Sequence, residues 1–120
     1  MMVIANVLVA LVAVLHLYFL VLEMFLWTKP LGLKTFNQTQ QKADDSAVLA
    51  ANQGLYNGFL AAGLIWGLFH PVAGVGFEIK LFFLLCVIVA GLYGGYSVNT
   101  RIILVQAVPA ALALALLLIA

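Results

Sequence analysis

The sequence predicts an all-α, polytopic membrane protein, a compact bundle of four transmembrane helices joined by short loops. Of its 120 residues, 67% are hydrophobic and only 8% are charged, and its mean hydropathy is +1.23. This composition lies far outside that of soluble domains. Four apolar segments are each long enough to cross roughly 30 Å of hydrocarbon, and they lie at about 3–27, 48–69, 77–97 and 102–120. Little chain is left over, so we expect a single integral membrane domain over residues 1–120.

The few charges orient these segments and argue against a nucleic-acid partner. Five cations stand against four acids, giving a net charge of +1 and no basic patch. Four cations fall in the first and third loops, namely Lys29, Lys34, Lys42 and Arg101. Near the opposite face there is only Lys80. The positive-inside rule therefore predicts a cytoplasmic loop at about 28–47 and both termini outside, in a plasma (inner) membrane.

The long loop contains signals for helix ends. Pro30 and Gly32 are expected to stop the first helix. The stretch FNQTQQKADDSAVLAANQ can form a short helix along the membrane interface. The second span is expected to be capped by one of three side chains, Asp44, Asp45 or Ser46. In the last span, Pro109 is expected to introduce a kink.

The first span carries two ionisable residues in HLYFLVLEMFLW, positions 16–27. His16 and Glu23 are seven residues apart, which places them within about 20° of one another on a helix, and Trp27 continues this face. A charge at the bilayer centre costs about 2.5 to 3.5 kcal/mol on insertion scales, so such groups must face the bundle interior or a wet cavity. The sequence leaves open whether Glu23 is charged and held by hydrogen bonds or neutral through protonation.

A second polar group begins the next span, VLAANQGLYNGFLAAGLIWG. Asn52 with Tyr56 and Gln53 with Asn57 form two i, i+4 pairs. Because neighbouring spans are antiparallel, these turns lie at the level of Glu23. We therefore predict a polar cavity that faces the cytoplasm. Its expected ligand-binding residues are Glu23, His16, Trp27, Asn52, Gln53, Tyr56 and Asn57. The alternative is that these side chains only form hydrogen bonds between helices.

Glycines at close spacing predict tight helix packing. They are Gly54 and Gly58, Gly63 and Gly67, and Gly91, Gly94 and Gly95. Small residues allow helices to approach closely, and the pattern leaves open whether the partner helix belongs to the same chain or to a second copy in a homodimer.

Cys86 lies in an apolar run and is expected to be a small buried hydrophobic residue. No set of ligands has zinc or di-iron spacing, so no metal or other cofactor is expected.

Several of these segments resemble the family called domain of unknown function 1304. The resemblance rests on HLYFLVLEMFLW, the following TKPLGLKTF and above all LAANQGLYNGFLAAGLIWG, and it extends over essentially the whole chain. It implies a membrane protein of four spans with no established activity to carry over. Some similar bacterial proteins carry the label epimerase, but four hydrophobic helices cannot form a sugar-nucleotide fold. The resemblance also implies one signature, formed by His16, Glu23, Trp27, Asn52, Gln53, Gly54, Tyr56, Asn57 and Gly58.

Three classes of function are compatible with these features. The first is binding or transport of a small polar molecule, an ion or an amphipathic lipid, with Glu23 as the ionisable centre. The second is an enzyme that acts on a lipid-soluble substrate, such as an isomerase, with Glu23 and His16 as its catalytic acid/base pair. The third is a non-catalytic subunit of a membrane assembly. In each case the lipid bilayer is an expected partner.

Overall fold

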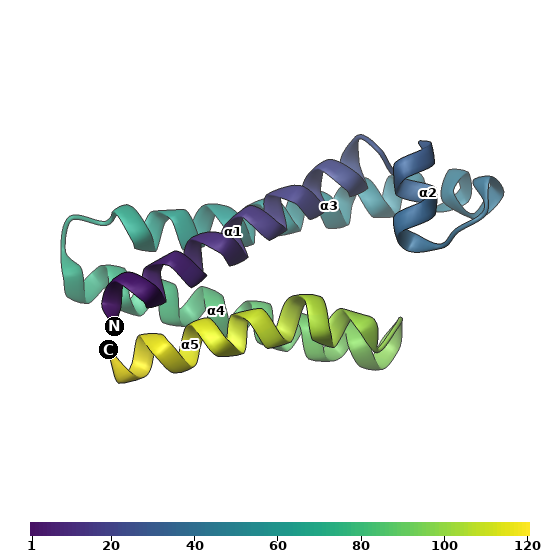
Figure 1. Ribbon diagram of the computed structural model, residues 1–120. Helices are drawn as coiled ribbons and strands as arrows, with labels where there is room; N and C mark the ends of the chain where they lie inside the picture. The colour runs from purple at the N-terminus through teal and green to yellow at the C-terminus, as the bar shows by residue number, and fades with distance from the viewer. The chain divides into compact units, whose positions relative to one another are not determined.

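All regular structure in this chain is helical, as the composition predicts. The computed structural model describes residues 1–120 (Figure 1). Its elements are α1 (Met2–Met24), α2 (Pro30–Phe36), α3 (Gln40–Phe69), α4 (Ala73–Ser97), the π-helix η1 (Ile103–Ala107) and α5 (Val108–Ile119). The all-α prediction is therefore confirmed.

Two of these helices, α1 and α4, are long and apolar enough to cross a membrane, and Ile103–Ile119 forms a shorter apolar stretch. Helix α3 has 30 residues, but the amides in its middle turns lower its average hydropathy. Four membrane crossings therefore remain a prediction for this chain.

The structure corrects two expectations about helix ends. Helix α1 stops at Met24, before Pro30 is reached, and Pro30 begins α2 instead. Proline suits this place because the first residue of a helix needs no backbone N–H donor. Helix α2 then ends at Phe36, and its C-cap Asn37 adopts the left-handed conformation with φ 52°.

The start of α3 is the second correction. The helix begins at Gln40, and the backbone N–H of Lys42 donates to Thr39 Oγ1 over 3.2 Å. Asp44 and Asp45 lie inside the helix, where they accept hydrogen bonds of 2.9 Å from the side chains one turn earlier. Such i, i+4 pairs support a helix. The expected interfacial helix and the second span therefore form one continuous helix.

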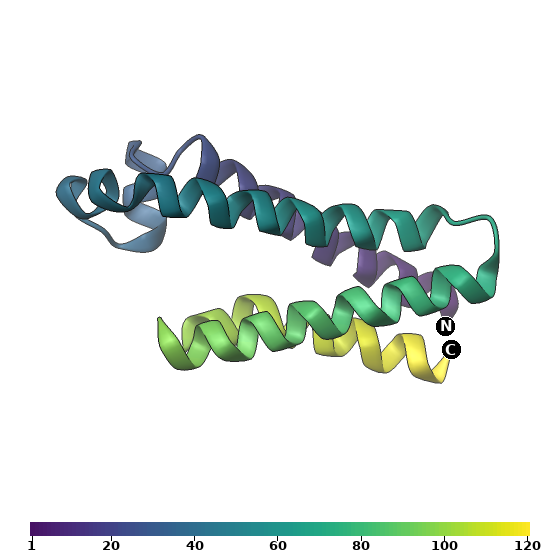
Figure 2. The same ribbon diagram turned by 180° about the vertical axis from the view of Figure 1, so that it is seen from behind.

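Contacts between residues divide the chain into two compact units. The first unit comprises Met1–Val14 and Leu60–Ala120, and the second comprises Leu15–Phe59. In the first unit, α4 runs antiparallel to η1 and α5 and lies beside them, and the two chain ends lie close together (Figures 1 and 2). Its core contains Ala5, Val9, Val12, Ala13, Leu64, Leu84, Val87, Ala110, Ala113 and Leu117. Many of these residues are small, so the backbones approach closely.

The last helical stretch begins with a wide turn at η1. The backbone N–H of Val108 bonds to the carbonyl of Ile103, five residues earlier. Pro109 follows directly, and proline both lacks an N–H donor and crowds the carbonyl four residues before it. The kink expected at Pro109 stays a prediction, and the structure shows a π-turn directly before this proline. Helix α4 packs closely here, because a Cβ added at Gly91 would lie 2.6 Å from the backbone nitrogen of Ala107.

Candidate functional site

The second unit brings Glu23 and Asn57 together. Glu23 is in the last turn of α1, and Asn57 is in the middle of α3. The Asn57 side-chain Nδ2 donates to Glu23 Oε1 over 2.5 Å. Asn57 is only 5% exposed, and Glu23 is partly buried. The carboxyl group is thus fixed by a neutral amide, and its second oxygen has no hydrogen-bond partner within the chain.

Glycines on α3 allow this approach. A Cβ added at Gly54 would lie 2.7 Å from Met24 Cγ and 3.1 Å from Glu23 Cβ. At Gly58, an added Cβ would lie 2.7 Å from Leu20 Cδ1. Gly54 and Gly58 therefore pack against α1 of the same chain.

Trp27 helps to hold the segment that joins α1 to α3. Its indole Nε1 donates to Ser46 Oγ over 3.1 Å, and its ring centroid lies 4.7 Å from that of Phe36. The Gln40 side chain adds a hydrogen bond of 3.2 Å to the carbonyl of Thr28. The indole N–H of the partly buried Trp27 is therefore satisfied within the protein.

Gly32 makes a close approach in the same segment. It is buried, and a Cβ added there would collide with the carbonyl oxygen of Leu26. Gly32→Ala is therefore expected to destabilise the chain by about 2 kcal/mol, because backbone atoms cannot move aside as a side chain does. Unfolding followed by tryptophan fluorescence in detergent measures the change. Gly74→Ala is the matched control, since no atom lies within 4 Å of its added Cβ. Equal effects at both glycines would contradict the prediction.

The other residues of the predicted lining lie apart from this pair. Asn52 Nδ2 donates to the Tyr56 hydroxyl over 3.1 Å, and both side chains are exposed. They are two residues either side of Gly54, so they project about 160° away from it around the helix. Gln53 is exposed as well. The structure thus places the polar residues of α3 on more than one face, and only Asn57 bonds to Glu23.

His16 lies nearer the middle of α1 than Glu23 does, and it is fully buried. Its ring centroid is 5.3 Å from that of Phe19 in an edge-to-face arrangement. Two helical turns separate His16 from Glu23, a rise of about 10 Å.

The model of the family described as "Protein of unknown function (DUF1304)" matches residues 10–118. The chain belongs to this family. The DUF1304 match includes both Glu23 and Asn57, and it confirms the resemblance noted from the sequence. A curated relative, "Uncharacterized protein YpaA" of Lactococcus lactis subsp. lactis (strain IL1403), is 35% identical over 116 residues, which are 95% of this chain and 96% of the relative. No solved structure matches the chain.

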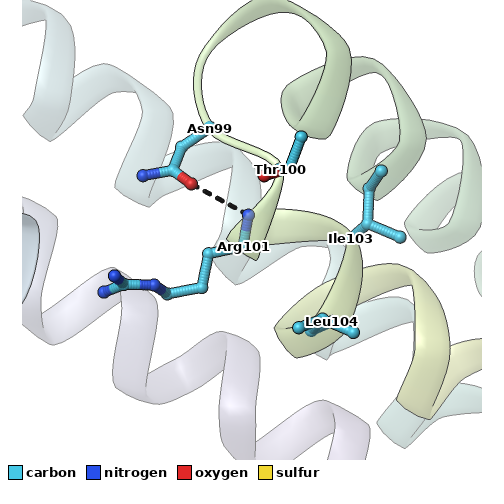
Figure 3. Close-up of a pocket in the computed structure, with 5 residues that line it drawn as sticks. All are labelled: Asn99, Thr100, Arg101, Ile103 and Leu104. Atoms are coloured by element: carbon cyan, nitrogen blue, oxygen red, sulfur yellow. Dashed lines mark hydrogen bonds between the residues drawn. The ribbon is translucent and has the colours of Figure 1, made fainter.

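Two surface cavities of this DUF1304 chain are lined by residues of the first unit, and neither lining includes Glu23. One, of about 520 Å³, is at the turn between α4 and η1 and is lined by Asn99, Thr100, Arg101, Ile103 and Leu104 (Figure 3). There the backbone N–H of Arg101 donates to Asn99 Oδ1 over 2.9 Å, and the Arg101 side chain extends away from Ile103 and Leu104 (Figure 3). The other cavity, of about 550 Å³, is an apolar hollow on α4 lined by Phe82, Leu85, Cys86, Val89, Ala90 and Tyr93.

Sequence reasoning missed a second polar pair in this DUF1304 chain, which lies in the first unit. Lys80 Nζ of α4 donates to Asn6 Oδ1 of α1 over 2.7 Å, and Lys80 is only 6% exposed. The sequence predicts Lys80 only as a charge near the opposite face, without a partner. The available signal was Asn6, a lone amide in the first turns of an otherwise apolar segment. Gly67 makes room for the lysine stem, since an added Cβ would lie 2.7 Å from Lys80 Cγ.

Proposed function

We propose that this DUF1304 protein is an integral membrane protein of four spans that binds or transports a small polar molecule, an ion or an amphipathic lipid at Glu23. In this proposal both termini are outside and the loop at about 28–47 is cytoplasmic. The lengths and hydropathies of α1 and α4 support membrane insertion, and the lysines of the loop support the orientation. The two chain ends lie close together within the first unit, which supports an even number of crossings because both ends are then on one side of the membrane.

The hydrogen bond between Asn57 and Glu23 is the observation that carries the proposal. An acidic side chain within an apolar helix is costly and by default marks a functional site. Asn57 fixes one carboxyl oxygen and leaves the other with acceptor capacity. A ligand with a hydrogen-bond donor or a positive charge fits this oxygen, and the partial burial of Glu23 keeps bulk water from satisfying it fully.

Glu23→Gln tests the site because glutamine keeps the shape of the side chain but not its charge. We expect mass spectrometry of protein released from native membranes to show small-molecule adducts on the wild type, with at least a tenfold loss in this variant. Glu78→Gln is the matched control, since Glu78 is an exposed glutamate of α4 and should leave the adducts unchanged. Identical adducts in a folded Glu23→Gln protein would refute a ligand site at Glu23.

A further inference from the structure

The buried lysine of the first unit lacks an opposite charge. Lys80 Nζ bonds to Asn6 Oδ1, and an amide oxygen is a neutral acceptor that does not balance an ammonium. The structure records no ion pair for Lys80. Glu78, the nearest acid along α4, is exposed and lies about 160° away around the helix. Burying a charge costs free energy unless the charge is paired, so a bound anion would stabilise the ammonium of Lys80.

The pair also offers hydrogen-bond donors that the chain does not use. An ammonium has three N–H donors, and an amide nitrogen has two. Asn6 accepts one of the lysine donors, and the structure records no acceptor for Asn6 Nδ2. Because Asn6 Oδ1 is turned toward Lys80, its Nδ2 is held beside the same ammonium. The two side chains thus present several donors around one positive charge.

The position of the pair along the helices indicates which anion can reach it. Lys80 is seven residues after Ala73, the first residue of α4, which corresponds to about 10 Å of helical rise. Asn6 is four residues after Met2, where α1 begins, a rise of about 6 Å. In a membrane, this depth is near the boundary between headgroups and acyl chains. The stem of Lys80 packs against Gly67. This packing restricts the movement by which an exposed lysine would bring its ammonium to water.

We propose that Lys80 and Asn6 together bind the phosphate of an anionic membrane lipid. Lysine is a common point-charge partner for phosphate, and the Asn6 amide donates to a second phosphate oxygen. The proposal rests on the membrane insertion proposed above but not on a ligand at Glu23.

The test uses the purified full chain in detergent, with lipid binding followed by native mass spectrometry. Wild-type protein is expected to retain phosphatidylglycerol at least tenfold better than phosphatidylcholine. Lys80→Gln should abolish this preference. Asn6→Asp should also abolish it. A carboxylate at the position of Asn6 Oδ1, 2.7 Å from Nζ, would pair with the ammonium in place of the lipid phosphate and would keep the bond between the two side chains. Lys34→Gln removes the same charge from an exposed residue and should leave the preference intact.

Three outcomes would overturn the inference. If Asn6→Asp folds and keeps the wild-type lipid preference, the pair only joins α1 to α4. If Lys80→Gln and Lys80→Arg behave alike in lipid binding, the charge at this position is not used. If inorganic phosphate at millimolar concentration displaces the lipid completely, the site takes free phosphate rather than a headgroup. Recovery of the chain from cells without detergent would instead refute membrane insertion itself. Glu23→Gln should leave phosphatidylglycerol binding unchanged, which separates this site from the first.

Discussion

Replacement of Asn57 with leucine is expected to destabilise the protein by about 2 to 3 kcal/mol. The change removes the only hydrogen bond that the structure records for the Glu23 carboxyl group. A partly buried acceptor that loses its donor keeps its desolvation penalty, which is larger for charged groups than for neutral ones. Unfolding in mixed detergent micelles, followed by the fluorescence of Trp27 and Trp66, measures the difference in the free energy of unfolding.

Two further variants make this prediction specific. Asn52→Leu also removes a side-chain amide from α3, but Asn52 is exposed and bonds only to the neighbouring Tyr56, so a change within about 0.5 kcal/mol is expected. The double variant Glu23→Leu with Asn57→Leu should recover much of the stability, because no acceptor is then left without a donor. If Asn52→Leu and Asn57→Leu lower the free energy of unfolding equally, the hydrogen bond to Glu23 does not contribute more to stability than the exposed bond to Tyr56.

A comparable decrease in the free energy of unfolding, about 3 kcal/mol, is expected for Gly91→Val in α4. An added Cβ would lie 2.6 Å from the backbone nitrogen of Ala107 and 3.0 Å from its Cα. Overpacking against a fixed backbone forces helices apart and typically costs up to this amount. The same unfolding measurement applies.

Gly94→Ala is the control for this second prediction. The nearest atom to its added Cβ is Ile102 Cγ2, at 3.1 Å, which belongs to a side chain that can rotate. Its expected effect is below about 1 kcal/mol, since alanine also favours the helix. A Gly91→Val protein as stable as Gly94→Ala would show that α4 and η1 do not pack as closely as described.

Composition and periodicity predict the helical class and place Glu23 and Asn57 in one group of polar residues, but they do not single out Asn57 as the partner of Glu23. The long apolar runs leave no other regular structure for most of the chain, and an isolated acid in such a run needs a polar partner. Asn57 was among the few amides available to Glu23. The ends of the helices were less predictable. Pro30 is compatible both with stopping one helix and with starting the next, and only the early end of α1 at Met24 decides between them.

The distribution of polar residues around α3 could not be obtained from spacing alone. Asn52 with Tyr56 and Gln53 with Asn57 satisfy the same i, i+4 rule, yet which pair faces α1 depends on where Gly54 contacts it. Lys80 shows the same limit. Its sequence neighbourhood suits a snorkelling residue, and its burial follows from an acceptor 74 positions away, Asn6.

The wide turn at η1 means that the last helix depends on the length of the chain as much as on its composition. A π-turn holds an extra residue compared with an α-helical turn. Deleting a single residue between Ile103 and Ala107 would remove this extra residue and let the segment close into a regular α-helix, with Ala110, Ala113 and Leu117 still facing the core. The same deletion between Ala110 and Ala113, where the helix holds no extra residue, would rotate every later side chain by about 100° and turn Ala113 and Leu117 away from the core. The tolerance of this helix to a lost residue therefore depends on whether the loss falls in η1 or in α5.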